Sequence, residues 1–171
     1  MVIRLNVVVL DPQLSRSSFL EMTFFVVELA ITDIEGTPSM KRIHIVAGII
    51  FNQDKSEIFI TKRPSDKHKG GFWEFPGGKV EEGETIEQAM VRELDEEIGI
   101  TVTEQSLFEH LEFDYPEKSL KFDFICVTAF ELEPYGKEGQ QGQWVAIEAL
   151  PNYEFPEANV PILQRVVKEY S

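Results

Sequence analysis

Three glutamates spaced for one face of a helix are the first feature of this sequence that suggests chemistry. Glu93, Glu96 and Glu97 lie at positions i, i+3 and i+4, so a helix would carry their side chains on one face. They belong to residues 80–100, which hold eight acidic residues and one basic residue. An ordinary acidic run is a solvated helix face, but these like charges crowd the helix end that disfavours anions. A cation would relieve that cost, and ligands that are all oxygen favour Mg2+ or Mn2+.

The helix that would carry these glutamates has clear end signals. Thr85 followed by Gln88 resembles a capping box, and Gly99 is a typical residue to end a helix. Between them the apolar residues recur at helical spacing, at Ile86, Ala89, Met90 and Leu94. The sequence therefore predicts a helix with one buried face and one acidic face.

Strand-like segments surround this helix. Ile43–Phe51 is a continuous apolar run and Glu57–Lys62 alternates, so the two predict a hairpin. Three further strands are expected, at residues 107–115, 120–130 and 143–147. This order predicts an α+β fold, a mixed β-sheet sandwiched between α-helices.

Two side-chain patterns refine this expectation. In the strand at residues 120–130, alternate residues from Leu120 onward form an apolar face, opposite Lys121 and Asp123. A last helix is expected from residue 159 to about residue 170, with Asn159 as its N-cap and Val167 among its buried residues. Cys126 falls on the apolar face and is expected in the core.

The composition excludes several classes of protein. The 171 residues include 16 Lys and Arg against 30 Asp and Glu, a formal charge of −14, which argues against nucleic-acid polymers and anionic membranes. An anionic small molecule stays compatible if a metal ion supplies positive charge. The most apolar stretch, residues 19–31, is too short to span a bilayer, and a single cysteine fits a reducing compartment. We therefore expect a cytoplasmic monomer.

The composition changes near residue 40. Residues 1–40 hold two basic and five acidic residues and contain neither Trp nor Tyr. Either this segment forms a strand pair or it stays loosely attached, and Met40 is an alternative start of the protein. We expect an N-terminal extension at residues 1–40 and one domain at residues 41–171.

The acidic segment resembles the signature of the Nudix hydrolases. Gly78, Glu84, Arg92-Glu93-Leu94, Glu96-Glu97 and Gly99-Ile100 match the whole Nudix box at its spacing. About residues 41–168 are similar to the MutT-type members, through Ile58-Phe-Ile-Thr-Lys-Arg63, Glu74-Phe-Pro-Gly-Gly-Lys79, Gly136-Lys-Glu-Gly-Gln140 and Phe155-Pro-Glu-Ala-Asn159. The resemblance implies a Nudix fold and hydrolysis of a nucleoside triphosphate, preferably 8-oxo-dGTP, to the monophosphate and pyrophosphate.

The resemblance also implies roles for the acidic residues. Mg2+, with Mn2+ as a substitute, would be held by Glu93, Glu96, Glu97 and Glu138 and by the carbonyl oxygen of Gly78. One carboxylate, Glu93 foremost, can instead take the proton of the attacking water. Arg92 would orient a carboxylate through a bidentate pair, and Glu84 would support the loop before the helix.

The substrate would be held by a second group of residues. By resemblance Arg63 and His68 contact phosphate, and Lys118 stands where the family can carry an arginine. Phe75 and Asn159 would read the base, although Phe75 can equally be a core residue. The amide of Asn159 can pair with the N7–H donor and O6 acceptor of 8-oxoguanine, whereas guanine presents two acceptors there.

Two other classes of function compete with this interpretation. The box is shared by Nudix enzymes that act on other nucleotides, dinucleoside polyphosphates or nucleotide sugars. A binding module of the same fold without catalysis is expected to lack one of the box carboxylates, and all of them are here. A simple acidic Ca2+ binder would also explain the acidic run, but the loop pattern of an EF-hand calcium site is absent from the sequence.

Overall fold

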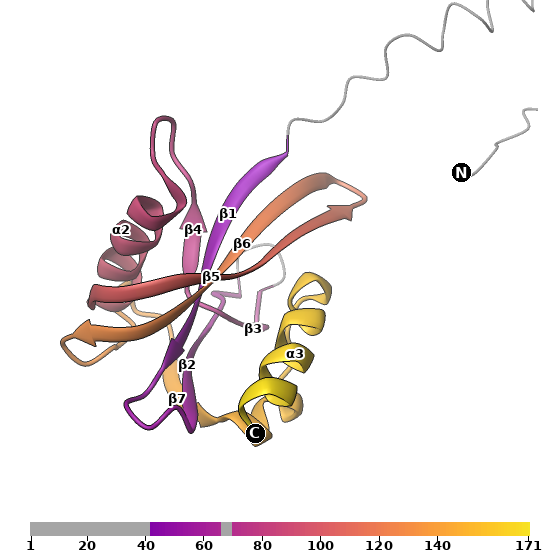
Figure 1. Ribbon diagram of the computed structural model, residues 1–171. Helices are drawn as coiled ribbons and strands as arrows, with labels where there is room; N and C mark the ends of the chain where they lie inside the picture. The colour runs from indigo at the N-terminus through magenta and orange to yellow at the C-terminus, as the bar shows by residue number, and fades with distance from the viewer. Residues whose placement is uncertain (1–41, 66–69) are drawn as a thin grey trace, which may run out of the picture. The chain divides into compact units, whose positions relative to one another are not determined.

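The computed structural model describes residues 42–65 and 70–171, so the expectations for residues 1–40 and for His68 lie outside the described residues. The strands are β1 (Ile43–Phe51), β2 (Glu57–Lys62), β3 (Trp73–Glu74), β4 (Gly77–Lys79), β5 (Thr101–Tyr115), β6 (Lys118–Glu131) and β7 (Gly142–Ala146). In this part of the chain they form one sheet in the order β3-β2-β1-β6-β5, with β4 beside β1 and β7 beside β2 (Figure 1). β1 and β6 run parallel and the other pairs are antiparallel.

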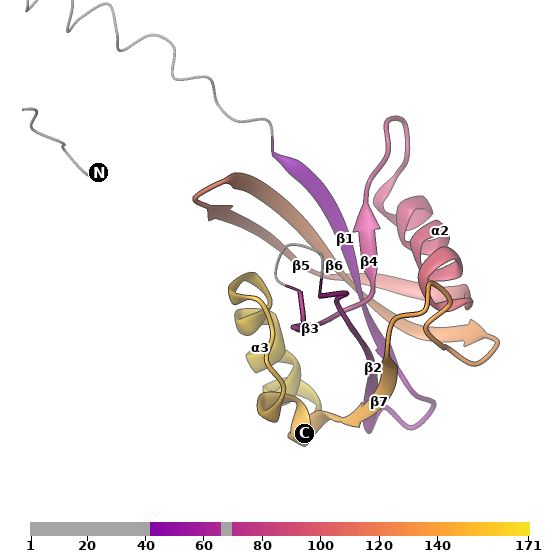
Figure 2. The ribbon, with the colours of Figure 1, turned by 180° about the vertical axis from the view of Figure 1, so that it is seen from behind.

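Helices cover both faces of this sheet. α2 (Ile86–Ile98) packs on one face, where Met90 and Leu94 meet Val46 and Ile125. α3 (Val160–Tyr170) covers the other face, together with the 3-10 helices η1 (Ile147–Asn152) and η2 (Glu157–Asn159). Figures 1 and 2 show α2 and α3 on opposite sides of the strands. The predicted α+β arrangement, a mixed sheet between helices, is confirmed.

β1 changes its partner part-way along its length. Residues 45–47 pair with β4, whereas Ile50 and Phe51 pair with β2, and β6 follows the other edge of β1. At the change, the Gly48 N–H donates to the carbonyl oxygen of Pro76 at 2.7 Å. β4 and β2 therefore branch away from the same strand, and the cavities described below lie where they branch.

Both ends of α2 form as the sequence predicts. The Thr85 hydroxyl accepts from the Gln88 N–H at 3.2 Å, and the Gln88 side chain accepts from the Thr85 N–H at 3.0 Å. Gly99 ends the helix at φ 72°, a left-handed conformation that glycine adopts without strain. This frame fixes which side of the helix carries its glutamates.

The structure corrects three local expectations. β5 begins at Thr101, six residues before the predicted start. The sequence did not indicate these first residues as a strand because they are mostly exposed and lack an apolar alternation. The segment at residues 143–147 ends as a strand at Ala146, and Ile147 opens η1 instead. Val167 is only partly buried.

The face of β6 that carries Asp123 is also more buried than its sequence suggests, because Ile125 and Val127 on that face pack beneath α2. Asp123 itself has no exposed surface. Its two carboxylate oxygens pair with His44 Nε2 on β1 and His110 Nδ1 on β5. Three neighbouring strands are thus joined through one buried carboxylate.

We expect His44→Ala to lower the free energy of unfolding by about 2–4 kcal/mol, because it leaves the buried carboxylate of Asp123 without one partner. In an Asp123→Asn background the same change should cost clearly less, since no buried charge is left unpaired. Urea unfolding of the four proteins measures both losses. Equal losses in the two backgrounds would show that His44 contributes by packing alone.

Candidate active site

The glycines before α2 bring the chain against its glutamates. The Gly77 N–H donates to Glu97 Oε2 at 2.7 Å. A Cβ built on Gly78 would lie 2.2 Å from Glu93 Oε2, so any other residue there would displace this carboxylate. The short strand β4 and the last turns of α2 therefore meet through two carboxylates.

Arg92 holds the neighbouring acidic groups in place. Its Nε and Nη2 atoms donate to the two oxygens of Glu84 at 2.7 and 2.9 Å, and its Nη1 donates to Glu93 Oε1 at 2.8 Å. Nη2 also reaches the carbonyl oxygen of Lys79 at 3.0 Å. The Arg92 hydrogen bonds, with help from the Glu81 N–H, lower the pKa of Glu84 to about 2. Arg92 thus orients Glu93 from behind and ties the preceding loop to the helix.

Glu97 is the carboxylate with the most unusual environment. Its pKa is raised to about 7, chiefly by burial; the nearby charge of Glu74 acts in the same direction and the Gly77 N–H acts in the opposite one. The Thr61 hydroxyl donates to Glu97 Oε1 at 3.3 Å. Glu97 is therefore a partly buried carboxylate at the end of α2, and within residues 42–65 and 70–171 no hydrogen bond described for its carboxylate comes from Lys or Arg.

Glu93, Glu97 and Glu138 line one cavity of about 200 Å³. Glu138 comes from the loop between β6 and β7, and the exposed Glu96 is not among the described residues that line this cavity. Within residues 42–65 and 70–171, no group of three His, Cys, Asp or Glu side chains already stands as a metal site, so these carboxylates would have to turn toward an ion. The donor set, all oxygen around the space kept open by Gly78, fits a hard divalent cation.

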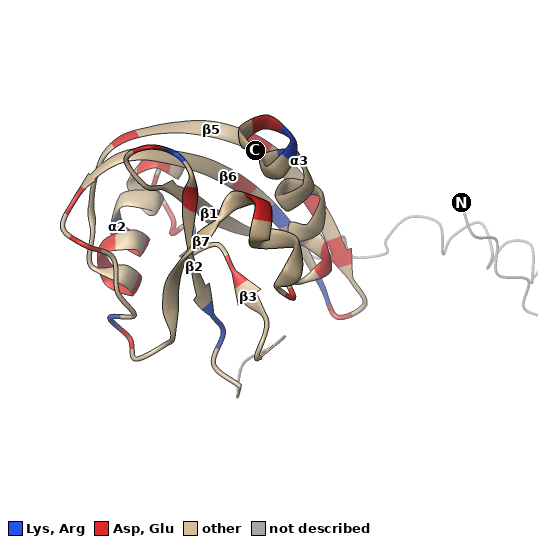
Figure 3. Cartoon of the chain, turned by 90° about the horizontal axis from the view of Figure 1, so that it is seen from below, with Lys and Arg blue, Asp and Glu red and all other residues tan. Residues whose placement is uncertain are grey.

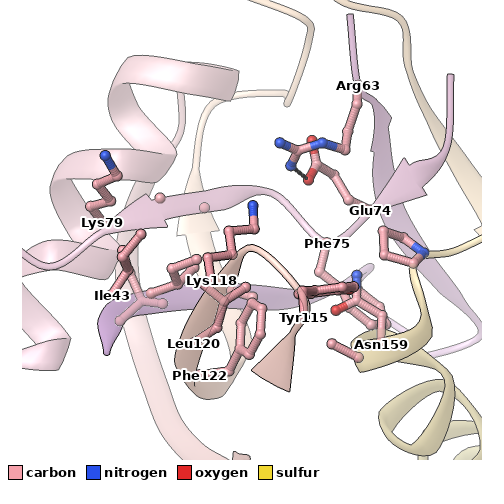
Figure 4. A pocket seen from close by; sticks show the side chains of 17 residues that line it. Ile43, Arg63, Glu74, Phe75, Lys79, Tyr115, Lys118, Leu120, Phe122 and Asn159 are labelled. Carbon is pink, nitrogen blue, oxygen red and sulfur yellow. Dashed lines mark hydrogen bonds and ion pairs between the residues drawn. The ribbon is translucent and has the colours of Figure 1, made fainter. Parts of the chain in front are cut away.

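A second cavity, of about 290 Å³, adjoins the first and shares Arg63, Glu74 and Gly77 with it. Its deeper walls are apolar and aromatic, and Figure 4 shows Phe75, Tyr115 and Asn159 together at one end. Phe75 is 3% exposed and packs on Phe124 and Phe155, so it is a core residue that also lines the cavity.

The expected N-cap role of Asn159 is wrong. Asn159 is the last residue of η2, its backbone is already helical, and its side chain forms no capping bond with α3. The side chain is instead buried, with 7% exposure, and faces the cavity lined by Phe75 and Tyr115 (Figure 4). A buried amide is thus presented to an aromatic pocket.

Positive side chains line the second cavity, and one of them, Arg63, also lines the first. Lys and Arg are sparse on the described chain, and the end of β2 is one place where they occur (Figure 3). Arg63 follows β2 and pairs with Glu74, while Lys118 lies over the Tyr115 ring, 5.8 Å from its centroid. Burial lowers the pKa of Lys118, and the charge of Arg63 lowers it further. Arg63, a predicted phosphate contact, therefore lines both cavities and Lys118 lines the second, whereas His68 lies outside the described residues.

Comparison with known proteins assigns the chain to a family. The NUDIX domain family matches residues 46–165. The chain belongs to the Nudix family. An 8-oxo-dGTP diphosphatase of Escherichia coli K12 is 49% identical over 127 residues, which cover 74% of this chain and 98% of that protein.

Two further relatives bear different names. A solved MutT, from a study of the proteins of Aliivibrio salmonicida and Vibrio cholerae, is 68% identical with a TM-score of 0.70, covering 76% of this chain and all of that one. A CTP pyrophosphohydrolase of Escherichia coli K12 is 34% identical over 125 residues, 73% of this chain and 91% of that protein. Nudix hydrolases in general use divalent metal ions.

Sequence reasoning gave no role to several residues that the structure brings to this site. Glu74 pairs with Arg63 at the junction of the cavities, and Gln140 donates to Glu97. Tyr115 forms a wall of the pocket beside Asn159. Glu74 and Gln140 lie in stretches that match MutT-type enzymes, and this match could have indicated that they belong to the site. No sequence feature indicates a role for Tyr115.

The raised pKa of Glu97 predicts how the metal-free protein responds to pH. The folded protein holds the Glu97 proton up to about pH 7 and the unfolded chain only up to about 4.5, so stability is lost as pH rises between these values. The difference corresponds to about 3 kcal/mol. In EDTA, Glu97→Gln should therefore raise the melting temperature at pH 8 and change it little near pH 4.5.

The matched control is Glu96→Gln, on the exposed glutamate beside it. Thermal unfolding of the wild type and both variants across this pH range measures the effect. A gain from Glu97→Gln that is the same at pH 4.5 and pH 8 would contradict the assignment.

Proposed function

We propose that this Nudix hydrolase converts 8-oxo-dGTP and water to 8-oxo-dGMP and pyrophosphate, with Mg2+ as its cofactor. The observation that carries the proposal is the buried amide of Asn159, which makes no capping bond and faces a pocket adjoining the carboxylates. Removing this nucleotide from the precursor pool would prevent mutation during DNA replication.

Asn159 supplies the discrimination between damaged and normal bases. Its carbonyl oxygen accepts from N7–H of 8-oxoguanine while its NH2 group donates to O6. With guanine the carbonyl oxygen would face the N7 lone pair, an unfavourable contact for an amide that is itself only 7% exposed. Phe75 and Tyr115 enclose the base beside this amide.

The residues of α2, β4 and the loop before β7 carry the hydrolysis. Mg2+ or Mn2+ would be held by Glu93, Glu96, Glu97, Glu138 and the Gly78 carbonyl oxygen. When bound, the ion neutralises phosphate charge and lowers the pKa of the attacking water. Glu93, oriented by Arg92, or Glu138 accepts the proton of that water.

The positive residues place the triphosphate. Arg63, His68 and Lys118 contact phosphate oxygens, and the first and last of these stand beside the pocket that receives the base. The lowered pKa of Lys118 follows from burial next to another cation, an environment that an anionic phosphate would relieve.

We also propose that residues 41–171 form the catalytic domain and residues 1–40 an extension outside it. The family match at residues 46–165 and the proposed site residues all lie within that domain. No helix of residues 42–65 and 70–171 is long and apolar enough to cross a membrane. We propose a cytoplasmic monomer that acts on free nucleotides. The charge of −14 argues against nucleic-acid polymers as substrates, and the free thiol of Cys126 is typical of a reducing compartment.

Asn159→Ala should compress the preference for the damaged nucleotide. We expect kcat/KM for 8-oxo-dGTP to fall by about 30- to 1,000-fold, with a much smaller fall for dGTP, since only the first loses a bidentate pairing. Asn152→Ala, at an exposed position of η1, is the matched control. An equal fall of kcat/KM for both nucleotides would show that Asn159 does not recognise the base. If the wild-type protein instead prefers CTP as its substrate, the alternative Nudix activity would be favoured.

Hydrolysis should require a divalent cation. Excess EDTA should abolish turnover, and added Mg2+ or Mn2+ should restore it, because the oxygen ligands of this cavity leave phosphate charge unneutralised without an ion. Steady-state release of pyrophosphate measures the effect. Full turnover in excess EDTA would contradict the metal assignment.

A further inference from the structure

A single side-chain amide connects the two segments that carry the carboxylates. The Glu138 N–H donates to Gln140 Oε1 at 3.0 Å. The other end of the same amide, Gln140 Nε2, donates to the carbonyl oxygen of Glu97 at 2.9 Å and reaches Glu97 Oε1 at 3.5 Å. Gln140 therefore touches the backbone of one proposed metal ligand and both the backbone and the side chain of another.

The loop that carries Glu138 is fixed by more than this amide. Residues 136–139 form a tight turn, in which the Gly139 N–H donates to the Gly136 carbonyl oxygen at 3.0 Å. The Lys137 N–H donates to the Glu97 carbonyl oxygen at 3.0 Å, and Lys137 Nζ donates to the Asp95 carbonyl oxygen at 2.7 Å. The turn thus docks on the C-terminal end of α2.

The docked turn provides hydrogen-bond donors and positive charge at the C-terminal end of α2. The last carbonyl groups of a helix lack partners within it, and α2 has no basic residue in its last turn. Lys137 supplies the missing positive charge, and the backbone of the loop supplies the donors. The turn is therefore held at the acidic end of α2 by contacts within the chain itself.

From this arrangement we infer that Gln140 is a positioning residue, which fixes Glu138 and Glu97 relative to each other for metal binding. The inference rests on the proposed function, because it takes both carboxylates as ligands of the catalytic ion. The amide of Gln140 offers both the acceptor for the Glu138 N–H and the donor for Glu97 on one side chain. A glutamate at position 140 would lose the donor and place a third negative charge beside Glu97.

Outer partners that orient metal ligands typically control metal affinity or activity by about 10- to 100-fold. We expect Gln140→Ala to weaken Mn2+ binding by about tenfold or more and to lower kcat in the same range. KM for 8-oxo-dGTP should change little, because Gln140 lies outside the pocket that receives the base. Gln140→Glu should be worse than Gln140→Ala.

The experiment measures the Mn2+ dissociation constant without substrate, by electron paramagnetic resonance, together with kcat, KM and thermal unfolding. Gln141→Ala, on the exposed neighbouring glutamine, is the matched control and should resemble the wild type. Gln140→Met, which keeps the length of the side chain without its hydrogen bonds, replaces Gln140→Ala if the latter fails to fold.

A double-mutant cycle with Glu138→Gln separates positioning from a general loss of structure. If Gln140 acts by placing Glu138, Gln140→Ala should alter Mn2+ affinity much less in the Glu138→Gln background. Unchanged Mn2+ affinity of Gln140→Ala, or an equal loss in both backgrounds, overturns the inference. The Mn2+ measurement needs no substrate, so failure of the wild type to hydrolyse 8-oxo-dGTP would overturn the proposed function and leave this test intact.

Discussion

The electrostatic cost of gathering carboxylates at one end of α2 is the constraint on which the rest of this structure depends. Glu93 and Glu97 face a backbone that has no side chains at Gly77 and Gly78, and Glu138 is brought to them by a docked turn. Arg92 offsets part of the repulsion from one side and Lys137 offsets the helix end from another. What is left uncompensated is seen in Glu97, whose pKa burial raises to about 7. The all-oxygen donor set fits a divalent cation, and Nudix hydrolases in general use such ions.

The sheet is built so that this charged cleft adjoins an apolar pocket. Because β1 pairs with β4 along one half and with β2 along the other, the two strands diverge and the cavities occupy the branch. Arg63 and Glu74 belong to both cavities, so a nucleotide can place its base in one and its phosphates at the other. In the proposed function, the chemistry common to the Nudix family and the recognition of one particular base are therefore assigned to different elements that share a wall.

The sequence predicted those features of the fold and the site that depend on residues close together in the chain. The capping box at Thr85, the spacing of the three glutamates and the glycine that ends α2 lie within a few turns of chain, and the structure forms the helix as predicted. Burial of Asp123 was missed because it depends on His44 and His110, which are distant in sequence. The capping role expected of Asn159 was wrong because η2 precedes α3 and already sets a helical backbone there. Likewise, the hydrogen-bond partners of Gln140 depend on how its loop packs against α2, and no periodic pattern in the sequence indicates that packing.

The central claim is that base recognition and metal chemistry are separate parts of one site. Calorimetric dissociation constants of 8-oxo-dGMP and dGMP, measured in EDTA, test it most directly. The account predicts that 8-oxo-dGMP binds about 30-fold or more tightly than dGMP even without a metal ion, because the amide of Asn159 needs none to read the base. Equal affinity for the two nucleotides in EDTA would contradict it.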